Sequence, residues 1–224
     1  VSKRMHFFST VMVAAGAHFS AIWIVVANSW QQTPTGHHIV QHELGTRAEI
    51  VDFWAMVFNP SFVDRIWHVY MGAWQAGAFF VLSVSAWYLL KNRHINFAKI
   101  SLKIGLVFAA IASLLQLVSG HSSAVGVAEN QPAKLAAFEA HYDASAPADL
   151  WLFGWVDDES QIVKYGIKAP GMLSYLIYGN VNHPVTGLNH FPEDERPPVN
   201  LVFQSYHAMV GIGMLLILLS WLGL

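Results

Sequence analysis

Four long runs of apolar residues, separated by polar stretches, dominate the pattern of the chain. They cover residues 7–30, 62–90, 100–118 and 199–224. An α-helix needs roughly 20 predominantly apolar residues to cross a bilayer, and these runs meet or approach that length. The pattern predicts an all-α fold, a polytopic membrane helical bundle of about four transmembrane helices with a long extracytoplasmic loop. The third predicted helix is the shortest.

The spacing of these runs divides the chain into three parts. Residues 1–118 hold three predicted transmembrane helices, and an amphipathic segment near 48–58 is expected to lie at the membrane interface. Residues 119–198 are rich in Pro and Gly yet too apolar for a disordered linker, so we expect a folded loop, which at this length is usually functional. Residues 199–224 form the fourth predicted helix.

Basic residues set the predicted orientation. Lys3 and Arg4 precede the first run, and the short connection between the second and third runs is also basic, with Lys91, Arg93, Lys99 and Lys103. The positive-inside rule places both sites in the cytoplasm. We therefore expect a cytoplasmic N-terminus for the fragment and residues 119–198 on the outer face. The chain starts without Met and stops inside an apolar run, so we expect a fragment of a longer protein.

Composition narrows the class further. Apolar residues make up 54% of the chain and charged residues only 12%, whereas a soluble domain carries about 25% charged residues. The net charge of -2 indicates no nucleic-acid partner. The absence of cysteine excludes disulfides, thiolate metal sites and C-x-x-C-H haem attachment.

Polar residues inside the first run suggest a function within the membrane. His18, Ser20 and Asn28 lie in this run, and polar side chains at bilayer depth are costly and usually face a bundle interior or a proton path. Ser20 and Asn28 are eight residues apart, so they lie near the same helical face. They could relay protons through ordered water, or they could form interhelical hydrogen bonds. Without other information, we favour the second role.

His68 and Met209 are candidate haem ligands. They lie about nine and eleven residues into their helices, or roughly 12 and 15 Å from the outer ends, so their depths are similar. A His and a Met can supply both axial ligands of a low-spin haem. Nearby glycines could let a porphyrin approach the helix backbones: Gly72, Gly77, Gly211 and Gly213. On spacing alone, a packing His and a gap-filling Met remain the more common explanation.

Three further groups of residues have open interpretations. His37, His38 and His42 could bind a metal, although a solvated loop is favoured. Lys134 and Glu139 could lie on a surface helix or bind a polar headgroup. His207 precedes Met209 by two residues and faces another side of the helix, where it could contact a haem propionate or a loop.

Several motifs together resemble subunit I of the cytochrome bd-type quinol oxidases. In order they are GAHFSAIWIVVANSW, NP, IWH, QPAKLAAFEA, LFG, HPVTGLN and SYHAMVGIG. Their order and spacing match over essentially the whole chain. The resemblance covers about four of the nine helices of that subunit and a periplasmic quinol loop of the shorter form.

The resemblance implies roles for specific residues. His68 and Met209 match the axial ligands of a low-spin haem b, and Lys134 and Glu139 match a loop pair implicated in quinol oxidation. Ser20 and Asn28 match polar positions on a helix associated with proton delivery. The fragment would belong to a quinol:oxygen oxidoreductase and would be inactive alone.

The resemblance also implies partners and a location. The partners are ubiquinol or menaquinol, oxygen, a second oxidase subunit and membrane lipid, and the location is the bacterial inner (cytoplasmic) membrane. A high-spin haem b and haem d are expected in the complete subunit, with ligands outside this chain. A first-helix His, two glutamates of the third helix, a later Glu and a Gly-Arg-Gln-Pro-Trp motif are absent from this sequence.

One residue of this sequence departs from the family pattern. His207 stands where the family often has Arg.

A non-catalytic b-type haem electron carrier and a helical membrane transporter are the alternative functions. The transporter would have broken helices near the midplane, and the four runs lack paired Pro and Gly breaks.

Overall fold

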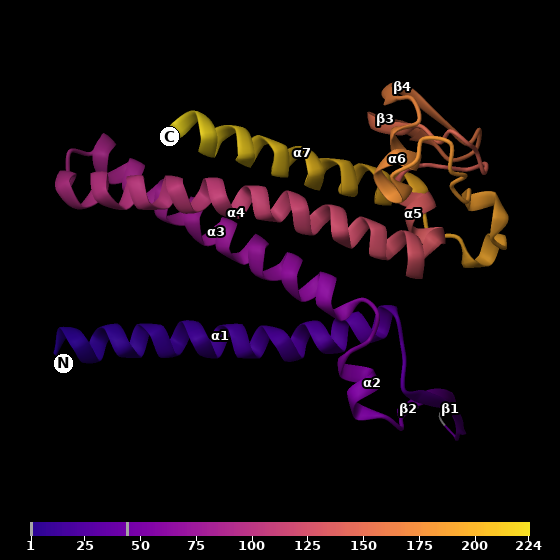
Figure 1. Ribbon diagram of the computed structural model, residues 1–224, viewed down its shortest axis with the longest axis horizontal. Helices are drawn as coiled ribbons and strands as arrows, with labels where there is room; N and C mark the ends of the chain where they lie inside the picture. The colour runs from indigo at the N-terminus through magenta and orange to yellow at the C-terminus, as the bar shows by residue number, and fades with distance from the viewer. Residues whose placement is uncertain (1, 44) are drawn as a thin grey trace. The chain divides into compact units, whose positions relative to one another are not determined.

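A computed structural model describes residues 2–43 and 45–224. It is mainly helical, and four helices are long and apolar enough to cross a membrane (Figure 1). These are α1 (Lys3–Gln32), α3 (Phe62–Leu90), α4 (Ile95–Asn130) and α7 (Val199–Gly223). The predicted all-α membrane fold with four spans is confirmed. Val1 and Leu44, which fall within the predicted first part, lie outside the described residues.

The chain forms two compact units, Val1–Tyr70 and Met71–Leu224, and the boundary falls inside α3. In the first unit, the end of α1 is fastened to the start of α3 by a buried polar network. Asn59 Nδ2 donates to Ser29 Oγ at 2.9 Å, and Thr33 Oγ1 donates to Ser61 Oγ at 2.9 Å. Apolar side chains pack beside this network, namely Val25, Val26, Val57 and Phe62. These contacts position the first turns of α3, where His68 lies.

The segment expected at the interface has a different structure. The strands β1 (His37–His42) and β2 (Gly45–Ile50) form an antiparallel hairpin, in which His37 pairs with Ile50. The short helix α2 (Phe53–Val57) follows, and the side chain of Asp52 caps it by accepting a hydrogen bond from the Ala55 N–H at 3.0 Å. Residues 48–58 are therefore the end of a strand followed by one short helix, and their location at the membrane interface stays a prediction.

In the second unit, α4 is the longest helix, whereas the sequence predicted residues 100–118 as the shortest span. The apolar run ends near Val118, but the helix continues to Asn130 because small side chains beyond it, including Ser119 and Ala128, are buried by packing. Gln75 Nε2 on α3 donates to Ser113 Oγ at 2.9 Å, which ties α3 to α4. Tertiary packing thus extends a helix that hydropathy alone would end.

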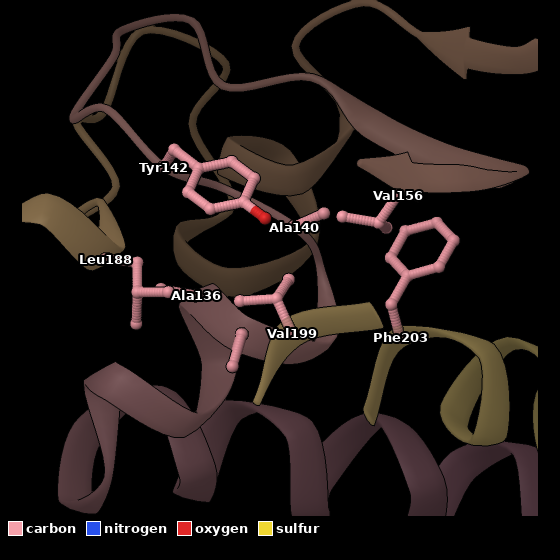
Figure 2. Packing of buried hydrophobic residues seen from close by; sticks show 8 residues of the cluster. Ala136, Ala140, Tyr142, Val156, Leu188, Val199 and Phe203 are labelled. Atoms are coloured by element: carbon pink, nitrogen blue, oxygen red, sulfur yellow. The ribbon is translucent and has the colours of Figure 1, made fainter. Parts of the chain in front are cut away.

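The predicted loop 119–198 begins within α4, which ends at Asn130, and its remainder, residues 131–198, is a folded region. It contains the helices α5 (Pro132–Phe138) and α6 (Met172–Tyr178), the 3-10 turns η1 (Leu188–His190) and η2 (Glu193–Glu195), and the strands β3 (Leu150–Asp157) and β4 (Ile162–Ala169). The two strands form an antiparallel hairpin with register irregularities along β3. This region and the start of α7 share an apolar core, in which Val156 of β3 lies against Phe203 of α7 (Figure 2). The core holds α5 and the hairpin against the first turns of α7.

Candidate functional site

Glu139 caps the C-terminal end of α5, in the packed region at the start of α7. Pro132 begins this helix, where its missing N–H costs no hydrogen bond. The Glu139 N–H donates to the Leu135 carbonyl at 3.1 Å and so closes the last turn. Lys134 is half-buried on the same helix, five residues earlier. The structure thus places both predicted quinol-site residues on one short helix and its cap.

The carboxyl group of Glu139 is almost completely buried, with an exposed fraction of 3%. Burial raises its pKa from 4.5 to about 8, because an apolar environment disfavours the charged form. Its Oε2 has no hydrogen-bond partner among the residues that the structure describes. Buried polar atoms are nearly always paired. An unpaired acidic group whose pKa lies close to neutral is suited to exchanging a proton with a ligand.

An aromatic contact of Phe138, the residue before Glu139, connects the end of α5 to α7. The ring of Phe138 stacks on that of Tyr206, with centroids 4.2 Å apart and 25° between the planes. Tyr206 precedes Met209 by three residues, so the two lie on neighbouring positions of one helical face. The sequence pattern does not mark Tyr206 as a site residue. Its spacing from Met209 was the available signal, but the stacking partner is 68 positions away in the chain.

His141 is a second residue that sequence reasoning missed. Its Nε2 lies 3.2 Å from the Val185 carbonyl oxygen. Burial is the largest effect on this imidazole and lowers its pKa below 6.5. A histidine whose pKa is lowered by burial therefore lies two residues after the buried carboxyl group of Glu139.

Met209 lies on α7, and its side chain is 54% exposed. Gly211 and Gly213 follow it, and a Cβ added at either glycine would meet no atom within 4 Å. Gly213 lies about one turn after Met209 on the same side of α7, and a thioether beside an open glycine position fits a flat ligand such as haem. Gly77 is equally open, but a Cβ at Gly72 would lie 3.4 Å from the Gln116 amide, so that glycine serves packing between α3 and α4.

His68 lies half-buried near the start of α3. The Tyr70 hydroxyl donates to the His18 carbonyl at 2.8 Å, and this bond fixes the adjoining turn against α1. His68 belongs to the first unit and Met209 to the second. Their role as a ligand pair therefore stays a prediction.

Asn28 lies on α1 near its C-terminal end, and its Oδ1 accepts a hydrogen bond from Arg65 Nη1 at 3.3 Å. This contact joins α1 to α3 and agrees with the interhelical role that we favoured for the polar residues of the first run. Ser20 is exposed on the same helix. Proton transfer by these two residues stays a prediction.

The three histidines of the first loop lie on the hairpin β1–β2. His37 and His38 are consecutive on β1, and His38 Nε2 lies 3.6 Å from Glu49 Oε2. Across residues 2–43 and 45–224, no three His, Asp or Glu side chains gather into a group that could hold a metal ion. The hairpin places these histidines along a strand instead of around a common centre.

The helices and the folded region define a class of protein. It is a polytopic helical membrane protein with a buried carboxyl group, whose pKa is raised by burial, beside one of its spans. The chain belongs to the cytochrome bd terminal oxidase subunit I family, whose model matches residues 1–224.

Relatives and a solved structure agree with this assignment. The chain is 37% identical over 227 residues to a putative cytochrome bd menaquinol oxidase subunit I of Bacillus subtilis, which covers 100% of this chain and 50% of that protein. It is 37% identical over 198 residues to the cytochrome bd-II ubiquinol oxidase subunit 1 of Escherichia coli, covering 88% of this chain and 38% of that protein. The bd oxidase structure from Geobacillus thermodenitrificans matches with a TM-score of 0.87 and 33% identity over 98% of this chain and 50% of that chain. The chain thus spans about half the length of these relatives or less.

Proposed function

We propose that this chain is part of a quinol:oxygen oxidoreductase and carries its quinol-oxidising segment and the ligands of a low-spin haem b. Membership of a terminal oxidase family supports this function over a transporter. The names of two relatives include menaquinol and ubiquinol, so quinol is the proposed substrate class. Oxygen reduction is assigned to no residue of this chain.

The observation that carries the proposal is the buried carboxyl group of Glu139, with one unpaired oxygen and a pKa of about 8. Oxidation of a quinol releases protons from its hydroxyl groups. In its ionised form, Glu139 would accept one of them, and a pKa near the working pH suits that role. The Lys134 ammonium group, which can only donate hydrogen bonds, would orient an oxygen of the head group.

His68 and Met209 would hold the haem b. When bound, this group supplies one-electron transfer. The imidazole and thioether are suitable donors to its iron, and the open position at Gly213 leaves room beside Met209. We assign these two residues the task of fixing the group at a set depth in the membrane.

The remaining assignments concern membrane placement and protons. We propose that residues 119–198 form the quinol-binding loop on the outer face, with residues 1–118 and 199–224 providing the membrane helices and the N-terminus of the fragment in the cytoplasm. Ser20 and Asn28 would lie along a proton path. A second oxidase subunit and membrane lipid would complete the assembly in the bacterial inner membrane.

Substitution of Glu139 in the complete oxidase tests the quinol site. We expect Glu139→Gln to abolish most quinol-driven oxygen uptake while leaving uptake driven by an artificial one-electron donor unchanged. The matched control is Glu129→Gln, because Glu129 is an exposed glutamate at the end of α4. Normal quinol turnover in Glu139→Gln would refute its role as proton acceptor.

A reduced-minus-oxidised visible spectrum of the complete subunit tests the haem ligands. We expect His68→Ala and Met209→Leu each to remove the low-spin b-type band. Met214→Leu, which alters another half-exposed Met on α7, and His121→Ala, which alters an exposed His on α4, should retain it. A full band in Met209→Leu would assign the thioether a packing role instead.

A further inference from the structure

The β3–β4 hairpin is held against α7 by side chains from two successive turns of that helix. Gln204 Nε2 donates to the Gly154 carbonyl oxygen at 2.7 Å. One turn later, His207 Nε2 lies 2.8 Å from the Trp151 carbonyl oxygen, and the His207 ring stacks on Phe203 with centroids 3.9 Å apart. Both contacts reach main-chain oxygens, so they fasten the strand itself.

The local structure of β3 explains why these oxygens bond to α7. The register of the β3–β4 pair shifts between Trp151 and Phe153, and again between Phe153 and Trp155. At such irregularities the ladder of strand hydrogen bonds is interrupted. Side chains of α7 contact the main-chain oxygens of Trp151 and Gly154, which lie at and between these irregularities. Phe203, which is completely buried against Val156, adds apolar contact at the same place (Figure 2).

His207 and Met209 point to nearly opposite sides of one helical turn. Residues two apart on an α-helix are separated by about 200° around its axis. The imidazole therefore holds β3 on one side, while the thioether is presented on the other. Fixing the imidazole to the Trp151 carbonyl restricts rotation of this turn, and that rotation decides where the Met209 sulfur points.

We propose that His207 is a positioning residue that orients Met209 by bonding α7 to the main chain of β3. The inference rests on the proposed function, because it takes Met209 as a haem ligand. Met ligation tends to raise the haem potential. A turn that is free to rotate would orient the Met209 sulfur less firmly toward the haem. Loss of the His207 contact should therefore lower the midpoint potential of the haem.

The test uses the complete oxidase and four variants. His207→Ala removes the contact, His207→Gln keeps a side-chain N–H donor, and Gln204→Ala removes the neighbouring contact one turn away. Ser205→Ala is the matched control, because Ser205 is exposed on α7 and its hydroxyl donates to the Leu201 carbonyl within the same helix. The two readouts are hydrogen exchange of residues 150–157 and the midpoint potential of the low-spin haem.

The variants have distinct expected outcomes. His207→Ala should speed exchange about tenfold, as loss of roughly one hydrogen bond predicts, and should lower the potential. His207→Gln should restore both values, Gln204→Ala should speed exchange without moving the potential, and Ser205→Ala should change neither. Unchanged exchange in His207→Ala, or faster exchange with an unchanged potential, would overturn the positioning role. Absence of a low-spin band from the unmodified enzyme would instead refute the proposed function.

Discussion

The ring of Phe138 stacks on the ring of Tyr206, with their centroids 4.2 Å apart. Phe138 immediately precedes Glu139, the proposed proton acceptor, and Tyr206 lies three residues before Met209, the proposed haem ligand. One aromatic contact therefore joins the segment proposed to oxidise quinol to the helix proposed to bind haem. Aromatic pairs contribute about 0.5–1.5 kcal/mol beyond their buried area. This contact therefore helps fix the end of α5, where Glu139 lies, against α7.

Tyr206 should matter through its ring more than through its hydroxyl group. We expect Tyr206→Phe to preserve the stack on Phe138, and Tyr206→Ala to lower the free energy of unfolding by about 1 kcal/mol or more. Thermal unfolding in detergent and quinol-driven oxygen uptake would be measured together. Loss of turnover in Tyr206→Phe, with unchanged stability, would point to a role for the hydroxyl group instead.

The buried carboxyl group of Glu139 should make stability depend on pH. Its pKa is about 8 in the folded protein and 4.5 ordinarily. Below pH 4.5 both states are protonated and the stabilising contribution is complete. Between pH 4.5 and 8 the unfolded chain releases the proton while the folded chain retains it, so rising pH favours unfolding. The unfolding temperature of the wild type should therefore fall from pH 5 to 8 more steeply than that of Glu139→Gln, and parallel curves would contradict this prediction.

The same pKa should shape the pH dependence of turnover. Glu139 accepts a proton only when it is ionised, so quinol oxidation should rise by about tenfold per pH unit below pH 8 and then level off. The measurement is quinol-driven oxygen uptake by the complete oxidase between pH 6 and 9. Glu129→Gln should keep this profile. A rate that is flat across this range would show that ionisation of Glu139 does not limit the reaction.

The network around Asn59 should stabilise the first unit. Asn59 is buried, and its Nδ2 donates both to Ser29 Oγ at 2.9 Å and to the Met56 carbonyl at 3.0 Å. Asn59→Ala leaves these groups without their partner, which should cost about 1–3 kcal/mol in unfolding free energy. Asn130→Ala, at the exposed end of α4, is the control and should cost less. Equal losses from the two substitutions, measured by thermal unfolding, would argue against a stabilising network.

Some features followed from the sequence because they depend on local composition. Residues 62–90 read as a membrane span from hydropathy alone, and α3 has those bounds. The end of the next helix did not follow, since the polar residues after Val118 remain helical only through packing of side chains such as Ala128. The same limit applies to the strand at residues 45–50, since β2 forms by pairing with β1.

The candidate site divides in the same way. The sequence motifs predict Glu139, Lys134, His68 and Met209 as site residues and mark His207 as a departure from the family pattern, and these roles stay predictions. Burial raises the pKa of Glu139, and that burial comes from residues distant in the chain. The contact of His207 with Trp151 joins positions 56 residues apart. Motif and hydropathy patterns carry residue identity and helix length, whereas solvent exclusion and long-range partners exist only once the chain has packed.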